Sequence, residues 1–174
     1  AASDVYKRQK SNKRYTTGDM VKELAVTSGS RHLVGGQVLD LEGENQEISP
    51  RTLQFIHQSK TAALLTSSLK LGAMASGATN KKVESLEEFG QCTGLAFQVI
   101  DDILDVTQSS ETLGKSAGKD EAVNKATYPA IHGLKKSKKL AEKLTSKAIN
   151  ALKPFKSKGR KLEELAHYLL DREY

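Results

Sequence analysis

The sequence predicts an all-α protein whose functional site is built from facing helices. Ala, Leu, Lys and Glu are frequent and runs of β-branched residues are few, which favours helices over strands. Apolar residues also recur in helix-sized periodic segments, separated by short polar or glycine breaks, and no internal repeat stands out. With 174 residues, one domain with a substantial core is the expected organisation.

The first predicted helices lie between residues 18 and 76. Gly18 and Asp19 are expected to cap a helix to about residue 27, and a second helix is expected from about residue 30 to 43. Ser49 before Pro50 is a strong start signal, because serine caps helices and proline is tolerated at the first helical position. That third helix is expected to continue to about residue 76.

The second half of the chain contains a long helix, a long loop and three further helices. Asn80 is expected to cap the fourth helix, which runs to about residue 106. Residues 107–124 lack apolar periodicity and are predicted to form a loop of the length that commonly carries function. The remaining helices are expected near residues 128–129, from about 135 to 152 and from about 159 to 172.

The fourth predicted helix contains FQVIDDILD, residues 97–105, an acidic cluster within an apolar stretch. On a helix, Gln98, Asp101, Asp102 and Asp105 fall within an arc of about 100°. The rest of the circumference is mostly apolar, so the helix should be buried. Three buried carboxylates would repel each other and lose hydration unless a cation compensates them. Oxygen ligands one turn apart favour a hard cation, and Mg²⁺ is the expected ion.

The alternative for this cluster is an ordinary solvated acidic face at a helix end. The DDxxD pattern is short and also arises by chance. Ile, Leu and Val interleave with the acids here, and this pattern favours the metal site.

The third predicted helix contains HQSKTAAL, residues 57–64, in which one face holds a lysine and a threonine. The flanks are rich in Ala and Leu, so Lys60 is expected to be half-buried and to need an anionic partner. The alternative is a lysine that extends to solvent, beside a Thr61 that bonds back to its own helix. His57 is expected to be a satisfied core or boundary histidine.

Two glycines fall inside the second predicted helix, in the sequence GGQVLD. Gly35 and Gly36 each cost about 1 kcal/mol relative to alanine in a helix interior. Their presence implies the close approach of another backbone or of a ligand, and tight helix packing alone is the alternative. Gln37 and Asp40 project in neighbouring directions from the same helix.

The predicted loop contains GKSAGKD, residues 114–120, which offers Lys115 and Lys119, with Lys125 following. Its composition resembles that of phosphate-binding loops, but its spacing is not that of a Walker loop, and a plain surface loop is the alternative. Together with the carboxylates and Lys60, these lysines supply the groups that hold a diphosphate through Mg²⁺.

The net charge of +6 raises the possibility of nucleic-acid binding. However, the densest basic run, residues 135–139, leads into an amphipathic pattern, so a solvated helix face is expected and nucleic acid is not. No window approaches the apolar length of a membrane span. The single cysteine, Cys92, is expected to be a packed small residue, and it fits a reducing compartment, so a cytoplasmic location is predicted.

Four motifs in one order give a resemblance to a known family. GGQVLD, HQSKTAAL, FQVIDDILD and GKSAGKD followed by NKATYP resemble the trans-isoprenyl diphosphate synthases, the polyprenyl synthetases, and among them the farnesyl and geranylgeranyl diphosphate synthase group. The resemblance extends from about residue 15 to 172. It implies an all-α isoprenoid-synthase-type helical bundle around a central cavity. It also implies a short-chain prenyltransferase that condenses an allylic diphosphate with isopentenyl diphosphate by Mg²⁺-assisted ionisation, condensation and elimination.

The resemblance further implies roles for single residues. Asp101, Asp102 and Asp105 would bind Mg²⁺ and, through it, the allylic diphosphate. Thr61 and Gln98 would turn oxygens toward the developing allylic cation. Catalytic roles are thus expected for Lys60, Thr61, Gln98, Asp101 and Asp102, and substrate-binding roles for Lys60, Gln98, Lys115, Lys119, Lys125 and Arg172.

The sequence departs from the family in its upstream part. The family has a first aspartate-rich motif followed by an arginine pair, and no such pattern precedes Gly35. Residues 1–9 resemble translated sequencing adapter and are set aside as an artefact. Residues 10–174 are expected to be the C-terminal part of a single prenyl synthase domain, whose upstream half also contains the chain-length determinants. We therefore expect this chain, expressed alone, to have no prenyltransferase activity.

Three functions remain in view at this point. The first is the prenyltransferase, which is expected to be a homodimer when full length. The second is a non-catalytic, synthase-like subunit that regulates a partner through helix packing; the complete set of acids and lysines speaks against it. The third is a basic helical nucleic-acid binder, which a comparison of affinities for Mg²⁺-pyrophosphate and duplex DNA would separate from the first.

Overall fold

The computed structural model describes residues 14–44, 46–112 and 126–170, and every regular element in these ranges is helical. The predicted all-α fold is therefore confirmed. The elements are α2 (Thr17–Ser28), α3 (Leu33–Glu42), α4 (Pro50–His57), a single turn of π-helix that we call the π-turn (Gln58–Ala62), α5 (Ala63–Ala75), α6 (Asn80–Thr112), α7 (Tyr128–His132), α8 (Leu134–Ala151), a 3₁₀ segment (Lys153–Gly159) and α9 (Arg160–Leu170).

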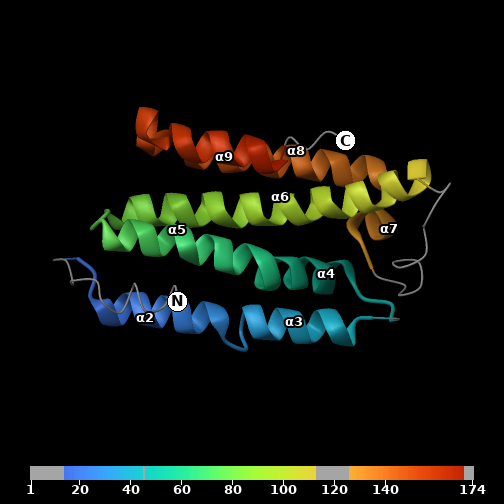
Figure 1. Ribbon diagram of the computed structural model, residues 1–174, viewed down its shortest axis with the longest axis horizontal. Helices are drawn as coiled ribbons and strands as arrows, with labels where there is room; N and C mark the ends of the chain where they lie inside the picture. The colour runs from blue at the N-terminus through green and yellow to red at the C-terminus, as the bar shows by residue number, and fades with distance from the viewer. Residues whose placement is uncertain (1–13, 45, 113–125, 171–174) are drawn as a thin grey trace.

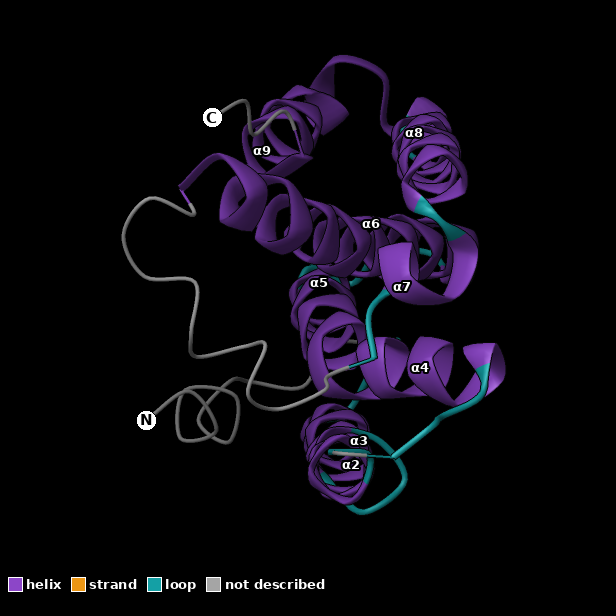
Figure 2. Ribbon diagram, turned by 90° about the vertical axis from the view of Figure 1, so that its right-hand side faces the viewer, coloured by secondary structure: helices purple, strands orange, loops and turns teal. Residues whose placement is uncertain are grey.

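The helices lie in layers around α6 (Figure 1). Helices α2 and α3 follow each other in one layer, α4 and α5 form the next, and α6 runs along them with α8 and α9 on its other side. Figure 2, which looks along the bundle, shows α6 between α5 and the pair α8 and α9, with α7 beside α4 and α6. At 33 residues, α6 spans about 50 Å; α4, α5, α7, α8 and α9 pack against it, while α2 packs on α5 and α3 packs on α4 and the π-turn.

The core forms on both sides of α6, as its mostly apolar circumference predicts. Phe89 and Ala96 pack with alanines of α8 and α9, whose small side chains allow the helices to approach closely. Val99 and Ile103 pack with Leu53 of α4 and other residues near α7. Cys92 is buried in the first of these clusters, and burial raises the pKa of its thiol, as expected for a packed residue.

The start of α2 differs from the prediction. Thr16, not Gly18 or Asp19, caps the helix: its Oγ1 accepts from Asp19 N at 3.1 Å, while Asp19 Oδ2 accepts from Thr16 N at 2.8 Å. This is a reciprocal capping box. Two hydrogen bonds from Thr16 lower the pKa of Asp19: the one from its backbone N–H has the larger effect, and the one from its hydroxyl has the smaller.

The acidic-motif helix also differs at both ends. Asn80, the predicted cap, is instead the first residue of the helix. The carbonyl oxygen of the preceding residue, Thr79, accepts hydrogen bonds from Lys82 N and Val83 N. The helix continues to Thr112, so residues 107–112 are helical and not part of the predicted loop. Thr107 Oγ1 donates to the carbonyl oxygen of Ile103 one turn earlier, a bond that polar residues can make inside a helix without apolar periodicity.

The long third helix was predicted closely. Ser49 Oγ accepts from Thr52 N at 3.0 Å and Pro50 occupies the first helical position, as expected. The helical segment continues through the π-turn to Ala75, and Gly77 follows with a φ of 69°, in the left-handed region that glycine favours. None of the described helices is long and apolar enough to cross a membrane.

Candidate diphosphate and metal site

The π-turn places Lys60 and Thr61 where α3 and α6 both approach it. A Cβ atom added to Gly36 of α3 would lie 2.8 Å from Lys60 N, and one added to Gly94 of α6 would lie 2.5 Å from Ala62 Cα. Only glycine allows approaches this close. The expectation that the mid-helix Gly36 marks a neighbouring backbone is therefore confirmed, and the neighbour is the π-turn. Such turns within α-helices are frequent at functional sites.

Lys60 has the anionic partner that its half-buried position requires. Its Nζ donates to Asp40 Oδ2 on α3, and the two side chains are 34% and 18% exposed. Asp40 belongs to the same GGQVLD sequence as Gly36, so α3 both approaches the π-turn and supplies the carboxylate that holds its lysine. The ammonium retains two further protons for an anionic ligand.

Asp102 is the buried member of the acidic cluster, with 7% of its surface exposed. Its Oδ2 lies 3.2 Å from His57 Nε2 at the end of α4 and accepts from Tyr128 N, the first residue of α7, at 2.9 Å. An ionised carboxylate can only accept, so Nε2 of His57 carries the proton of this bond. The prediction that His57 is a satisfied core histidine is confirmed by its 5% exposure and this contact.

The other two acids of the cluster are less buried than expected. Asp101 is half-buried and Asp105 is exposed, so only Asp102 loses most of its hydration, and the expectation of three buried carboxylates is wrong for the other two. Asp105, the exposed acid, lies toward the C-terminal end of α6, beyond the residues Val99 and Ile103 that the apolar cluster contains. The acids share one face of the helix but not one environment.

The donor set nevertheless suits a magnesium ion bound together with a diphosphate. Among the residues that the structure describes, no three His, Cys, Asp or Glu side chains converge as a metal cage. Mg²⁺ in phosphate sites is held by one or two carboxylates, with phosphate oxygens and waters completing its shell. Asp101 and Asp105 are one helical turn apart, and neither described bond to Asp102 uses its Oδ1.

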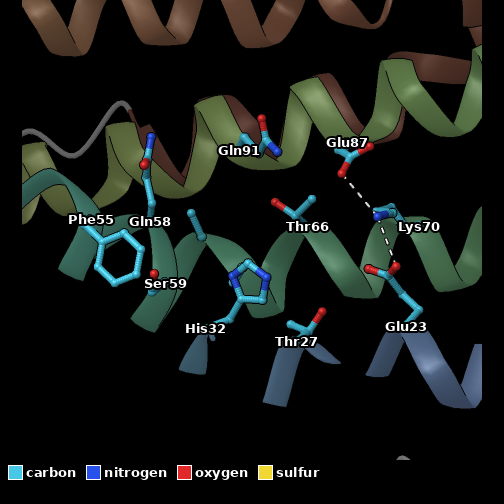
Figure 3. Close-up of a pocket in the computed structure, with 12 residues that line it drawn as sticks. Glu23, Thr27, His32, Phe55, Gln58, Ser59, Thr66, Lys70, Glu87 and Gln91 are labelled. Carbon is cyan, nitrogen blue, oxygen red and sulfur yellow. Dashed lines mark hydrogen bonds and ion pairs between the residues drawn. The ribbon is translucent and has the colours of Figure 1, made fainter. Parts of the chain in front are cut away.

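A cavity of about 320 Å³ opens beside α6 nearer its N-terminal end, and Gln58, Ser59 and Ala62 of the π-turn are among the residues that line it. None of the predicted site residues that the structure describes lines it. Figure 3 shows Gln91 and Glu87 of α6 facing it, with Thr66 and Lys70 of α5 opposite. Gln91 lies in the same stripe of α6 as Gln98, about two turns earlier, so the cavity and the acidic cluster follow one side of this helix.

An ion triad closes one end of this cavity. Lys70 Nζ lies 3.0 Å from Glu23 Oε2 of α2 and 3.1 Å from Glu87 Oε1 of α6 (Figure 3). Burial alone would lower the pKa of Lys70, but hydrogen bonds to the two glutamates outweigh it and raise that pKa. Thr66 also lines the cavity, and within the described residues its buried Oγ1 has no hydrogen-bond partner.

Of the remaining predicted site residues, two lie where the π-turn meets α6, and four lie outside the described residues. Thr61 is in the π-turn and Gln98 is one turn after Gly94 on α6, so both lie on the two elements that meet at Ala62. The remaining predicted contacts lie outside the described residues: Lys115, Lys119, Lys125 and Arg172.

The structure adds three groups to the candidate site that had no predicted role there: Asp40, which pairs with Lys60, and the His57 side chain and Tyr128 backbone, which both bond to Asp102. Asp40 had a signal, because it is an acid on the glycine-containing face of a helix. No sequence pattern indicated the pairing of His57 with Asp102, because 45 residues separate them and only the packing of the helices brings them together.

Comparison with known proteins shows similarity to one protein family over most of the chain. The sequence profile of the polyprenyl synthetase family matches residues 7–168. A chloroplastic geranylgeranyl pyrophosphate synthase of Capsicum annuum is 52% identical over 155 residues, which is 88% of this chain and 42% of the relative. The chain thus spans less than half the length of this relative.

Two solved structures share the fold. The FPP/GFPP synthase of Zymomonas mobilis has a TM-score of 0.79 at 28% identity, over 97% of this chain and 56% of that one. The geranyltransferase of Helicobacter pylori, complexed with magnesium and isoprenyl diphosphate, has a TM-score of 0.68 at 35% identity, over 89% of this chain and 51% of that one.

Proposed function

This chain belongs to the polyprenyl synthetase family, and from that premise we propose that it forms the allylic-diphosphate half of a short-chain prenyltransferase. The reaction is the condensation of an allylic diphosphate with isopentenyl diphosphate to give a farnesyl or geranylgeranyl diphosphate. Two contacts support it best: the π-turn that carries Lys60 packs against Gly94 of α6, the helix that also carries Asp101, Asp102 and Asp105, and His57, the residue before that turn, hydrogen-bonds to Asp102.

The proposed metal site consists of the acids of α6. Asp101 and Asp105 would hold Mg²⁺, with Asp102 adding its Oδ1. When bound, the ion neutralises charge on the diphosphate and makes it a better leaving group. The complex of the Helicobacter pylori geranyltransferase with magnesium and isoprenyl diphosphate supports this choice of ion.

The residues of this chain then act on the charge that develops when the allylic C–O bond breaks. Lys60 directs fixed positive charge at the departing diphosphate, and Lys115, Lys119 and Lys125 are proposed to add to it. Thr61 and Gln98 are proposed to turn their oxygen dipoles toward the allylic cation, which they stabilise without reacting. Arg172 is proposed to contact isopentenyl diphosphate.

The second candidate is a non-catalytic subunit of the same fold. Lys60, its Asp40 partner and the acids of α6 argue against it, because helix packing alone requires none of them. A homodimer in the complete protein and a cytoplasmic location remain our proposals. The Capsicum annuum relative is named chloroplastic, so a fluorescent fusion of the complete gene should distinguish the two compartments.

The direct test joins this chain to the part of the Capsicum annuum relative that the chain does not span, which we expect to lie upstream. The folded chimera is incubated with an allylic diphosphate, labelled isopentenyl diphosphate and Mg²⁺, and the product is identified. We expect an elongated prenyl diphosphate from the chimera and none from the 174-residue chain alone.

The acids are tested in the same assay. We expect Asp101→Ala to reduce turnover by about 100-fold or more while circular dichroism shows an unchanged helix content. Glu142→Ala, which removes an exposed acid of α8, is the matched control and should leave turnover unchanged. Near-normal activity of Asp101→Ala would remove the acidic cluster from the reaction, and a folded chimera without turnover would favour the regulatory subunit.

A further inference from the structure

One oxygen atom, Asp102 Oδ2, joins three elements of the proposed site. It takes part in a 3.2 Å hydrogen bond with His57 Nε2 from α4 and a 2.9 Å hydrogen bond with Tyr128 N from α7, while Asp102 itself belongs to α6. All three residues are buried, with exposures of 5%, 2% and 7% for His57, Tyr128 and Asp102. A buried carboxylate is tolerated when it is hydrogen-bonded in this way.

The position of His57 in the chain makes this contact relevant to the diphosphate. His57 is the last residue of α4, and the π-turn that carries Lys60 begins at the next residue. Its bond to Asp102 therefore fixes the start of that turn against the acidic cluster of α6. The contact links the lysine and the acids that are proposed to hold the two sides of a metal diphosphate.

The imidazole is itself held in place. Its ring stacks on that of Tyr128, with 5.4 Å between the ring centroids and 17° between the planes. Tyr128 thus supports the arrangement twice, with its ring against His57 and its backbone N–H on Asp102. With Oδ2 fixed by two donors, the plane of the carboxylate is fixed, and so is the direction of Oδ1.

We propose that His57 is a positioning residue: by holding Asp102 Oδ2 it sets the orientation of the carboxylate and its register with Lys60. This inference rests on the proposed function, because it assigns His57 an effect on Mg²⁺-diphosphate binding without any contact to the ligand. Hydrogen-bond partners of metal-ligating carboxylates typically contribute 10- to 100-fold to metal affinity. A histidine that only fills space would contribute to folding and not to this affinity.

The test measures Mg²⁺-pyrophosphate binding to the 174-residue chain by isothermal titration calorimetry. His57→Leu removes the donor and should weaken binding about 10- to 100-fold. His57→Gln places an amide N–H near the position of Nε2 and should stay within about threefold of the wild type. His132→Gln is the matched control, because His132 also lies against the Tyr128 ring, at 5.6 Å between the ring centroids, and should not change the affinity.

A folded His57→Leu variant with wild-type affinity would overturn the proposal. So would equal weakening by His57→Leu, His57→Gln and His132→Gln, because that pattern reports a loss of packing. If His57→Leu does not fold, His57→Asn takes its place; its amide is too short to reach Asp102, so it should weaken binding where His57→Gln does not.

A second measurement separates this inference from the proposed function. Hydrogen exchange of the Tyr128 N–H, followed by NMR, reports on Asp102 without any ligand. Exchange about tenfold faster in His57→Leu than in the wild type, with other α7 amides unchanged, supports the positioning role. An unchanged rate overturns it. If the wild-type chain binds no Mg²⁺-pyrophosphate, the proposed function fails, and this exchange rate still decides whether His57 positions Asp102.

Discussion

Lys60 and Asp40 form an ion pair across the junction of the π-turn and α3, over a separation of 20 residues. The pair lies beside the close approach of Gly36 to Lys60 N, so α3 contacts both the backbone and the side chain of the same residue. With the lysine 34% exposed, solvent screens the attraction, and its contribution to stability belongs in the range of surface pairs. Its main consequence is the direction in which the ammonium points.

The roles of the two partners can be separated by substitution. Lys60→Met should weaken Mg²⁺-pyrophosphate binding by about 10-fold or more, the value of a lost charged hydrogen bond. Asp40→Asn should change this affinity by less than about threefold, because the amide oxygen still accepts from the ammonium. In urea unfolding, a double-mutant cycle should give a coupling of about 0.5 kcal/mol. Calorimetric affinities reduced equally by both substitutions would contradict this division of roles.

The close approach of α6 to the π-turn predicts opposite effects for two glycine substitutions. Gly94→Ala would place a Cβ 2.5 Å from Ala62 Cα, so the helices must separate, and the free energy of unfolding should fall by about 1–3 kcal/mol. Gly72 of α5 has no atom within 4 Å of such a Cβ. Gly72→Ala should therefore raise the free energy of unfolding by about 0.4–1 kcal/mol. Urea midpoints measure both, and a stable Gly94→Ala variant would contradict the described packing.

Tyr128 should make the protein sensitive to alkali. Burial, followed by the nearby charge of Asp102, raises the pKa of Tyr128 from 10.0 to about 12. Above pH 10 the unfolded chain releases this proton while the folded chain keeps it, so stability falls as the pH rises from about 10 to 12. The loss is about 1.4 kcal/mol per pH unit.

Tyr128→Phe should remove this part of the alkaline destabilisation. Within the described residues the Tyr128 hydroxyl has no hydrogen-bond partner, so the substitution should cost little at neutral pH. The measurement is the free energy of unfolding in urea at several values between pH 9 and about 12 for both proteins. Parallel curves would show that the phenol of Tyr128 titrates normally.

The sequence was most informative where a structural signal is local. Ser49 and Pro50 mark the start of α4 because the cap and the fixed proline torsion act within one turn. The start of α2 was misplaced although its signal is equally local: Thr16 and Asp19 have the spacing of a capping box. The end of α6 was placed too early, because polar residues that bond back to their own helix give no apolar period.

The site was predictable in its composition but not in its pairing. Residue type and spacing predicted a metal site at the acids of α6 and an anionic partner for Lys60, whereas the proposed diphosphate contact of Lys60 came from the combination of motifs and the family resemblance. That Asp40 is the anion, and that Asp102 is held by His57, depends on how α3, α4 and α6 pack, which helical periodicity does not encode. The unequal burial of Asp101, Asp102 and Asp105 has the same origin, since neighbouring helices cover only part of their face.

The central claim is that this chain binds a magnesium diphosphate through the acids of α6 and Lys60. Its most direct test is a calorimetric titration of the 174-residue chain with pyrophosphate, with and without Mg²⁺. We expect binding that requires Mg²⁺, that is lost in Asp101→Ala and that persists in Glu142→Ala. Binding that does not require Mg²⁺, or that is undiminished in Asp101→Ala, or that is weaker than binding of duplex DNA under the same conditions, would contradict the claim.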